Sequence, residues 1–230
     1  MNEYTDFKTF LSISSNKLGI YLIDTKNHNA LFEKEFDLEK KNRRFDFNIL
    51  DKFLKENIFK IEKLIKQFVK NIFLIIDNEK IINHTIGIKK KNLNTKYLTN
   101  TISEVKDLFN KNYNDYKIMH IVINKILIDG NYHPTPLNDI DAKEISLEIT
   151  FIAIPKEIVF VYDKILEKYQ IKIAAYLNKN YIQTFCVQNK STIASMAQKI
   201  LNGYNVNEVK LVPKNTKKLG FFEKFFQLFS

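Results

Sequence analysis

The chain has 230 residues, of which 45% are hydrophobic and 27% charged, so it can bury a core in one large or two small domains. Its formal net charge is +10, yet only Arg43 and Arg44 are arginines, and arginine is the usual side chain that reads base edges and grips phosphates. No stretch approaches the ~20 apolar residues that cross a bilayer, and residues 1–6 lack a secretion signal, so we expect a cytoplasmic location.

The first part of the chain predicts three strands, a helix and a fourth strand. Residues 7–14, 17–25 and 28–36 are short β-prone runs separated by turn residues, which is typical of a meander. Apolar residues in 49–68, from Ile49 to Phe68, keep roughly to one face and predict a long helix. The near-continuous apolar run in 71–77 indicates a strand that is buried on both faces.

A second unit follows, and it predicts a strand at 80–89, a helix at 95–110 and a strand at 116–128. Residues 130–138 contain two prolines and predict a loop, because proline cannot donate to a strand ladder. Residues 144–154 alternate between apolar and polar side chains, which indicates a half-buried strand.

The last part of the chain returns to the first pattern. Pro155 suits the first turn of a helix that we expect to run to about Tyr169. A strand is predicted at 170–177, and a helix at 192–201 is expected to end at Asn202-Gly203, a plausible C-cap. A short strand is predicted at 206–212.

The cysteine, the histidines and the carboxylates form no pattern typical of a catalytic or metal site. Cys186 is the single cysteine, which excludes an internal disulfide and a cysteine-cluster metal site, and we expect it in the core. The four histidines are scattered without ligand spacing, so we expect structural or solvated roles for them and no bound metal. Carboxylates such as Asp139 and Asp141 are interpreted as solvated loop or cap residues.

The order of elements is similar to the first half of the FtsA family, actin-like proteins of bacterial cell division. The similarity is carried by 117–124, Ile128-Asp129-Gly130 with Pro136-Leu137-Asn138, and 147–155 with the helix that follows. It implies an α/β (α+β) fold: half of an actin-like, ribonuclease H-like fold with an inserted strand-helix-strand-strand subdomain and a C-terminal amphipathic helix. The implied first domain covers 1–78 and 155–212, and the insertion subdomain covers 79–154.

The family's first phosphate loop is degenerate in this chain. Ser12 stands where the resemblance expects an aspartate, and Ser14 stands where it expects a glycine; Ser15, Asn16 and Lys17 complete the loop. A serine carries no charge to orient a hydrated Mg²⁺, and its side chain obstructs the close approach of a phosphate. No second phosphate loop and no second actin-like domain follow. We therefore expect no cofactor, no ATP binding and no enzyme activity.

The C-terminal residues predict a membrane-targeting helix at 219–230 after a basic linker at 213–218. Five phenylalanines recur at i, i+1, i+4, i+5 and i+8, which places them on one broad side of a helix. Such a helix binds at a lipid interface, and nearby lysines add attraction to anionic headgroups. The membrane-binding residues that we predict are Lys217, Lys218, Leu219, Phe221, Phe222, Lys224, Phe225, Phe226, Leu228 and Phe229. The alternative is that the tail packs into a groove on its own domain or on a partner helix.

The resemblance implies a cell-division scaffold of the FtsA type, a peripheral protein on the cytoplasmic face of the inner membrane at the division site. Its expected partners are anionic inner-membrane lipid and division proteins, with FtsZ as a candidate, and it implies self-association through the insertion subdomain. FtsZ usually docks on the second domain, so that contact would need another surface here.

Two other functions stay open. One is a pilus- or secretion-assembly protein of the related actin-like type, although those relatives generally keep nucleotide loops and lack this tail. The other is a basic nucleic-acid-binding protein, which would need aromatic or arginine-rich surface motifs, and none stands out. We therefore expect no nucleic-acid partner.

Overall fold

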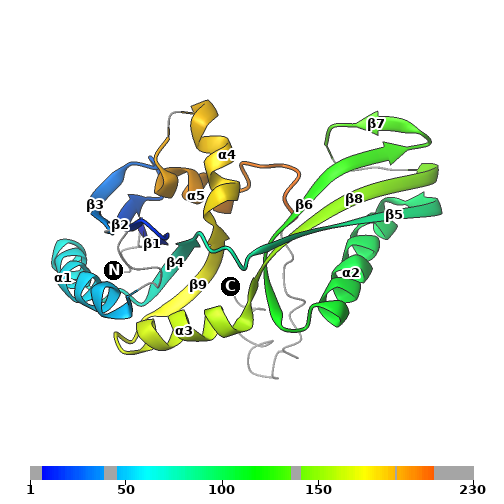
Figure 1. The fold of residues 1–230 in the computed structure, drawn as a ribbon. Helices are drawn as coiled ribbons and strands as arrows, with labels where there is room; N and C mark the ends of the chain where they lie inside the picture. The colour runs from blue at the N-terminus through cyan, green and yellow to red at the C-terminus, as the bar shows by residue number, and fades with distance from the viewer. Residues whose placement is uncertain (1–6, 39–45, 136–140, 190, 210–230) are drawn as a thin grey trace, which may run out of the picture.

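Two β-sheets, each with its own helices, form the molecule in a computed structural model (Figure 1). The structure describes residues 7–38, 46–135, 141–189 and 191–209. Among these residues, no helix combines the length and the apolar character that crossing a membrane requires.

The first sheet has five strands in the order β3-β2-β1-β4-β9. The antiparallel part contains β1, β2 and β3, and the parallel part joins β4 to β1 and β9 to β4. The strand bounds are β1 Phe7–Ile13, β2 Lys17–Asp24, β3 Ala30–Asp37, β4 Asn71–Ile76 and β9 Lys172–Asn178.

Helices cover both faces of this first sheet, which explains why its central strands are apolar on both sides. The helices α1 (Phe47–Ile65) and α3 (Lys156–Glu167) pack on one face, and α4 (Lys179–Asn189) and α5 (Ile193–Leu201) pack on the other. Alternating side chains of β1 serve the two faces: Leu11 belongs to the cluster with α1, and Phe10 belongs to the cluster with α5. The result is a three-layer α/β/α unit.

The second sheet is antiparallel, with the order β5-β8-β6-β7. Its strands are β5 Ile82–Asn94, β6 Tyr116–Ile128, β7 Asn131–His133 and β8 Asp141–Pro155, and the helix α2 (Thr95–Asn112) packs on one face. Phe109 of α2 is fully buried and stacks on Phe151 of β8 with ring centroids 4.7 Å apart. The chain leaves the first sheet after β4 and returns to it through α3, so this unit is an insertion (Figure 1).

The expected α/β fold with an inserted subdomain is confirmed; one local prediction is wrong, one helix was not predicted, and one predicted strand is a single bridge where it is described. The predicted loop 130–138 contains β7, which forms because Asp129 and Gly130 both have positive φ and close a tight turn. No helix was predicted at α4, in whose described part Ile182 is the one fully buried apolar residue, so the helical pattern is weak. Within the described part of the predicted strand 206–212, Glu208 makes an isolated bridge to Val122.

The burial of some side chains also differs from the prediction. Phe59, Leu64 and Phe68 were assigned to the apolar face of the long helix, but they are 67%, 54% and 80% exposed. Phe59 lies on the side of α1 opposite the core, and α1 ends at Ile65, so Phe68 is in the following turn. Cys186 was expected in the core but is half-buried on α4, and this partial burial raises the pKa of its thiol.

Two adjacent residues of α2 provide a direct test of the insertion core. We expect Phe109→Ala to lower the free energy of unfolding by about 3–5 kcal/mol, because it removes a buried ring and leaves a cavity. Leu108→Ala, at a side chain that is 50% exposed, is the control and should cost less than about 1 kcal/mol. Urea denaturation followed by circular dichroism measures both, and equal effects would refute the packing of α2.

Candidate partner-binding site

The two sheets meet where β6 of the insertion passes α3 and β9 of the first domain. The turn before β6 is fixed to the start of α3, because the Lys156 backbone N–H donates to Asp115 O at 2.8 Å. The Lys156 ammonium donates to Asn114 O at 2.6 Å. These bonds fix the distance between α2 and α3 at this end of the junction.

A groove with a volume of about 730 Å³ lies at this junction. It runs between α2 and α3, with the start of β6 at its base. Ten residues line it: Lys106, Asn110, Asn114, Tyr116, Lys117, Ile118, Lys156, Val159, Phe160 and Asp163. We call this feature the junction groove.

One wall of the junction groove is apolar. Phe160 of α3 is 63% exposed, and the ammonium of Lys164, one turn further along the helix, lies 5.8 Å from the centre of its ring. Val159 is buried beside it and belongs to the core of the first domain. An exposed aromatic side chain in a groove is a common anchor for a bound polypeptide.

The base of the groove is cationic and rigid. The Lys117 ammonium lies 4.5 Å from the centre of the Tyr176 ring, a favourable cation–π distance. The Tyr176 hydroxyl donates to Asp163 Oδ1 at 2.8 Å and lies 3.0 Å from Val159 O. Burial, together with Asp163, raises the pKa of Tyr176, so the hydroxyl stays protonated and keeps these bonds. With Lys106 and Lys156 also lining it, the groove suits a segment that carries apolar and acidic side chains.

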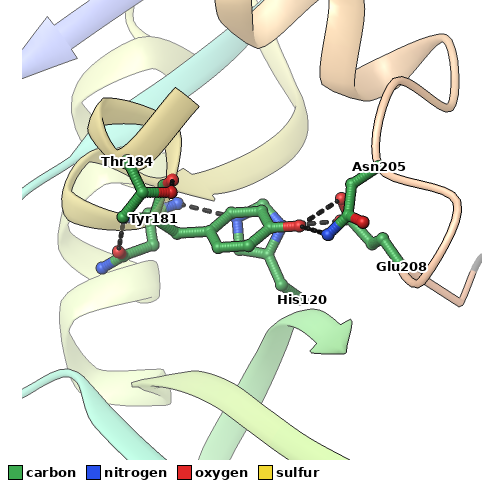
Figure 2. Close-up of polar contacts among 6 residues, drawn as sticks. His120, Tyr181, Thr184, Asn205 and Glu208 are labelled. Carbon is green, nitrogen blue, oxygen red and sulfur yellow. Dashed lines mark hydrogen bonds and ion pairs between the residues drawn. The ribbon is translucent and has the colours of Figure 1, made fainter. Parts of the chain in front are cut away.

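A half-buried polar cluster lies at the same junction, on another side (Figure 2). It contains His120 of β6, Tyr181 of α4, and Asn205 and Glu208 of the segment that follows α5; we call it the clasp. The two carboxylate oxygens of Glu208 lie 2.7 Å from His120 Nδ1 and 2.9 Å from the Tyr181 hydroxyl. Asn205 Nδ2 donates to that hydroxyl at 2.8 Å.

The bonds of His120 fix its tautomer. The backbone N–H of Asn178 donates to Nε2 at 2.9 Å, so the ring proton is on Nδ1 and points to Glu208. Asn178 ends β9, and its side chain accepts from the Tyr181 backbone N–H at 2.7 Å, which caps the start of α4. The histidine thus joins β6 of the insertion to β9 and α4 of the first domain.

Backbone bonds reinforce the clasp. The Val209 N–H donates to Ile121 O, and the Ile123 N–H donates to Asn207 O, both at 2.9 Å. The chain after α5 therefore lies beside β6, where Glu208 makes a single antiparallel bridge to Val122. Because one segment contacts both units, it restricts their relative rotation and hence the width of the junction groove.

The degenerate phosphate loop lies apart from the groove and is internally bonded. Ser12 and Ser14 are buried, and Ser14 Oγ lies 3.0 Å from both Asn16 Oδ1 and Lys17 O. Ser15 is exposed at the tip of this turn. Ser14 therefore bonds within its own turn, and the absence of nucleotide binding stays a prediction.

The Lys17 ammonium forms ion pairs with two carboxylates of β3. Its ammonium lies 2.8 Å from Glu35 Oε2 and 3.6 Å from Asp37 Oδ1. The Tyr21 hydroxyl donates to the other oxygen of Glu35 at 2.6 Å. The hydrogen bonds from Lys17 and Tyr21 hold the pKa of Glu35 below its usual value. A phosphate at this loop would have to compete with these bonds.

The membrane-targeting residues, Lys217 to Phe229, lie outside the described residues. In the part of the chain that is described, no cluster of three or more histidine, cysteine, aspartate or glutamate side chains could hold a metal ion. Sequence reasoning missed both the junction groove and the clasp; the one available signal was a histidine inside the apolar strand 116–128.

Comparison with known proteins identifies the fold. No protein-family model and no curated protein matches the chain. Among solved structures, it is similar to the PilM–PilN type IV pilus biogenesis complex, with 11% identity and a TM-score of 0.51 over 80% of this chain and 50% of that chain. The molecule is therefore a mixed α/β protein consistent with half of an actin-like fold, and it spans about half the length of that relative.

Two further structures match with lower TM-scores. One is the cytoplasmic domain of EpsL, an inner membrane component of the type II secretion system of Vibrio cholerae, with 6% identity and a TM-score of 0.37 over 76% of this chain and 57% of that chain. The other is a Bacteroides thetaiotaomicron protein with an actin-like ATPase fold and unknown function, with 14% identity and a TM-score of 0.30 over 82% and 60%. None of the three structures identifies the FtsA family in particular.

The clasp can be tested by removing its central carboxylate. Glu208→Ala leaves the buried His120 Nδ1–H and the half-buried Tyr181 hydroxyl without their acceptor, so we expect a loss of about 1–3 kcal/mol in the free energy of unfolding. Glu157→Ala is the control, because its ion pair with Lys80 is exposed and should contribute less than about 1 kcal/mol. Equal stability of the two variants in urea denaturation would contradict a structural role for the clasp.

Proposed function

We propose that this protein is a non-catalytic adaptor in a pilus- or secretion-type assembly, which holds a segment of a partner protein on the cytoplasmic side of the inner membrane. The observation that carries the proposal is the junction groove, a concave surface between the insertion and the first domain of an actin-like half. The similar PilM was solved in complex with PilN, which supports a protein partner for this fold.

The chemistry of the groove defines the partner segment. The exposed ring of Phe160 provides an apolar anchor, and Lys106 and Lys117 provide positive charge. A short segment that alternates apolar and acidic side chains complements both. Because the clasp and the bonds of Lys156 hold the walls in place, binding orders the partner more than it orders the groove, which favours affinity.

The phosphate-loop geometry supports a role without ATP hydrolysis. The ammonium of Lys17 is paired with Glu35 and Asp37, and Ser14 bonds within its own turn. In this proposal the actin-like half works as a rigid binding body, and no chemical step is assigned to it.

The C-terminal segment supplies the membrane attachment in this proposal. The ring-rich helix predicted at 219–230 partitions to the lipid interface, and the lysines near it favour anionic headgroups. Five partly buried rings contribute several kcal/mol, and ordering the helix offsets much of this, so attachment is reversible.

A division scaffold of the FtsA type is the second candidate. The phenylalanine-rich C-terminal sequence favours it, because FtsA proteins end in a similar short amphipathic helix. In that case the partners would be division proteins, with FtsZ as a candidate, and a fluorescent fusion would gather at midcell. The similarity to the PilM complex favours the pilus- or secretion-type reading.

Photocrosslinking tests the groove. A photoreactive phenylalanine analogue at position 160 should crosslink in cells to an inner-membrane component of a pilus or secretion assembly, because this side chain lies in the groove wall. The same analogue at Tyr132, which is 61% exposed on β7, is the control and should not capture that component. Crosslinks to FtsZ at position 160 would favour the division scaffold, and the same products at both positions would refute the groove as a specific site.

Vesicle co-sedimentation tests the tail. We expect Phe222→Glu/Phe226→Glu to weaken pelleting with vesicles that contain anionic lipid by at least about tenfold, because each change replaces an inserted ring by a charge. Lys214→Ala in the linker is a milder control. Equal pelleting of the wild type and the double variant would discard the tail as an anchor.

A further inference from the structure

A basic and aromatic surface on α1 belongs neither to the junction groove nor to the clasp. Its residues share high exposure and a position on the side of the helix that faces away from the sheet, or in the turn that follows the helix. We call it the α1 outer face, and it consists of Lys52, Lys55, Phe59, Lys63, Lys66 and Phe68.

The spacing of these residues defines a single stripe. Positions 52, 55, 59 and 63 follow one another at intervals of three or four residues, so their side chains lie along one side of a helix. Leu50, Leu54 and Ile61 are fully buried on the other side and fix the rotation of α1 against the sheet. Phe59 stands in the middle of the stripe and is 67% exposed.

The end of α1 adds a second exposed ring. Lys66 is the C-cap in the left-handed conformation, where the chain turns back toward β4. Val69 enters the core, and its N–H donates to Glu62 Oε1 at 3.0 Å, which anchors this turn. Phe68 precedes Val69 and is 80% exposed, so its ring points away from the core. The fold thus holds two exposed phenylalanine rings on an anchored backbone, and neither ring lines the junction groove.

The charges around the rings are mainly positive. Six exposed lysines lie at positions 52 to 70, against two glutamates: Glu62 bonds to the helix end, and Glu56 is exposed on the same side of α1 as Phe59 and Lys63. This surface carries lysines and no arginine. A lysine ammonium is a compact charge on a long flexible side chain, whereas an arginine guanidinium is a planar fork that fits a carboxylate or phosphate of fixed geometry. Lysine stems lie along apolar surface while their ammonium groups reach phosphates, which suits the boundary between acyl chains and headgroups.

We propose that the α1 outer face binds the surface of an anionic lipid bilayer. Phe59 and Phe68 enter the boundary below the headgroups, and the surrounding lysines contact lipid phosphates. The complementarity of charge and the convex shape of one helix face carry this choice, because a bilayer accepts projecting rings without a matching pocket. The contact is separate from the C-terminal segment and does not rest on the assembly role.

This contact would also orient the molecule. In Figure 1, α1 (cyan) lies at the left edge of the ribbon, and the insertion sheet with β5, β7 and β8 lies at the other end. The proposed contact is therefore made by the first domain, and the insertion subdomain stays available to a partner.

Vesicle binding of the full chain tests the proposal in a background that carries Phe222→Glu/Phe226→Glu. We expect this protein to retain weak binding to phosphatidylglycerol-containing vesicles and to show none with phosphatidylcholine alone. Adding Phe59→Ser/Phe68→Ser should weaken the residual binding by about tenfold, and adding Lys55→Gln/Lys63→Gln should also reduce its salt dependence. The matched control is Leu108→Ser/Tyr132→Ser, at side chains that are 50% and 61% exposed, and it should leave the binding unchanged.

Two results would overturn the proposal. One is residual binding that is equal for the α1 variant and the matched control, with circular dichroism showing that both are folded. The other is that the protein binds soluble polyglutamate as tightly as it binds the anionic vesicles, and that Phe59→Ser/Phe68→Ser does not change this affinity. That result would make the surface a site for an acidic polypeptide. The tail proposal is tested separately: it fails if Phe222→Glu/Phe226→Glu alone does not weaken vesicle binding. The adaptor proposal is tested by the crosslinks at position 160.

Discussion

The two bonds accepted by the Glu208 carboxylate set the geometry on which the rest of the molecule depends. The insertion leaves the first sheet after β4 and returns at α3, so two covalent connections alone would allow it to rotate. Glu208 accepts from His120 of the insertion and from Tyr181 of the first domain, and the His120 ring is buried, where an unpaired donor is costly. The shape of the junction groove follows from this restraint, because its walls belong to the two bodies that the clasp joins.

Local patterns in the sequence predicted most elements of the fold, and long-range contacts explain what they missed. The apolar run of β4 and the alternation in β8 are visible in single segments, so both strands were located within a few residues. The clasp joins residues 88 positions apart, and the groove collects side chains from three elements, so no local pattern marks either. Phe59 shows a different limit: an aromatic residue in a helix was counted toward the core, although its spacing from Leu50 and Ile58 places it on the other side.

The distribution of lysine gives the positive charge of this chain a structural meaning. In the phosphate loop, Lys17 is paired with carboxylates of its own sheet. In the junction groove, Lys117 lies over an aromatic ring beside an apolar wall. On α1, lysines surround two exposed phenylalanines. Lysine thus forms ion pairs within the phosphate loop and gives positive charge to the concave junction groove and to the convex α1 outer face. The groove suits an acidic polypeptide segment, and the α1 outer face suits anionic lipid.

The position of Glu208 along the chain has a consequence for biosynthesis. All strands of the insertion precede residue 156, and His120 precedes Glu208 by 88 residues. At translation rates of ~5–20 residues per second, roughly 3–11 s separate the synthesis of Pro155, the last residue of β8, from that of Glu208. During that interval the nascent insertion can fold but lacks the carboxylate that fixes its orientation, so the groove acquires its final shape late, and a partner present on the ribosome would meet a more open junction.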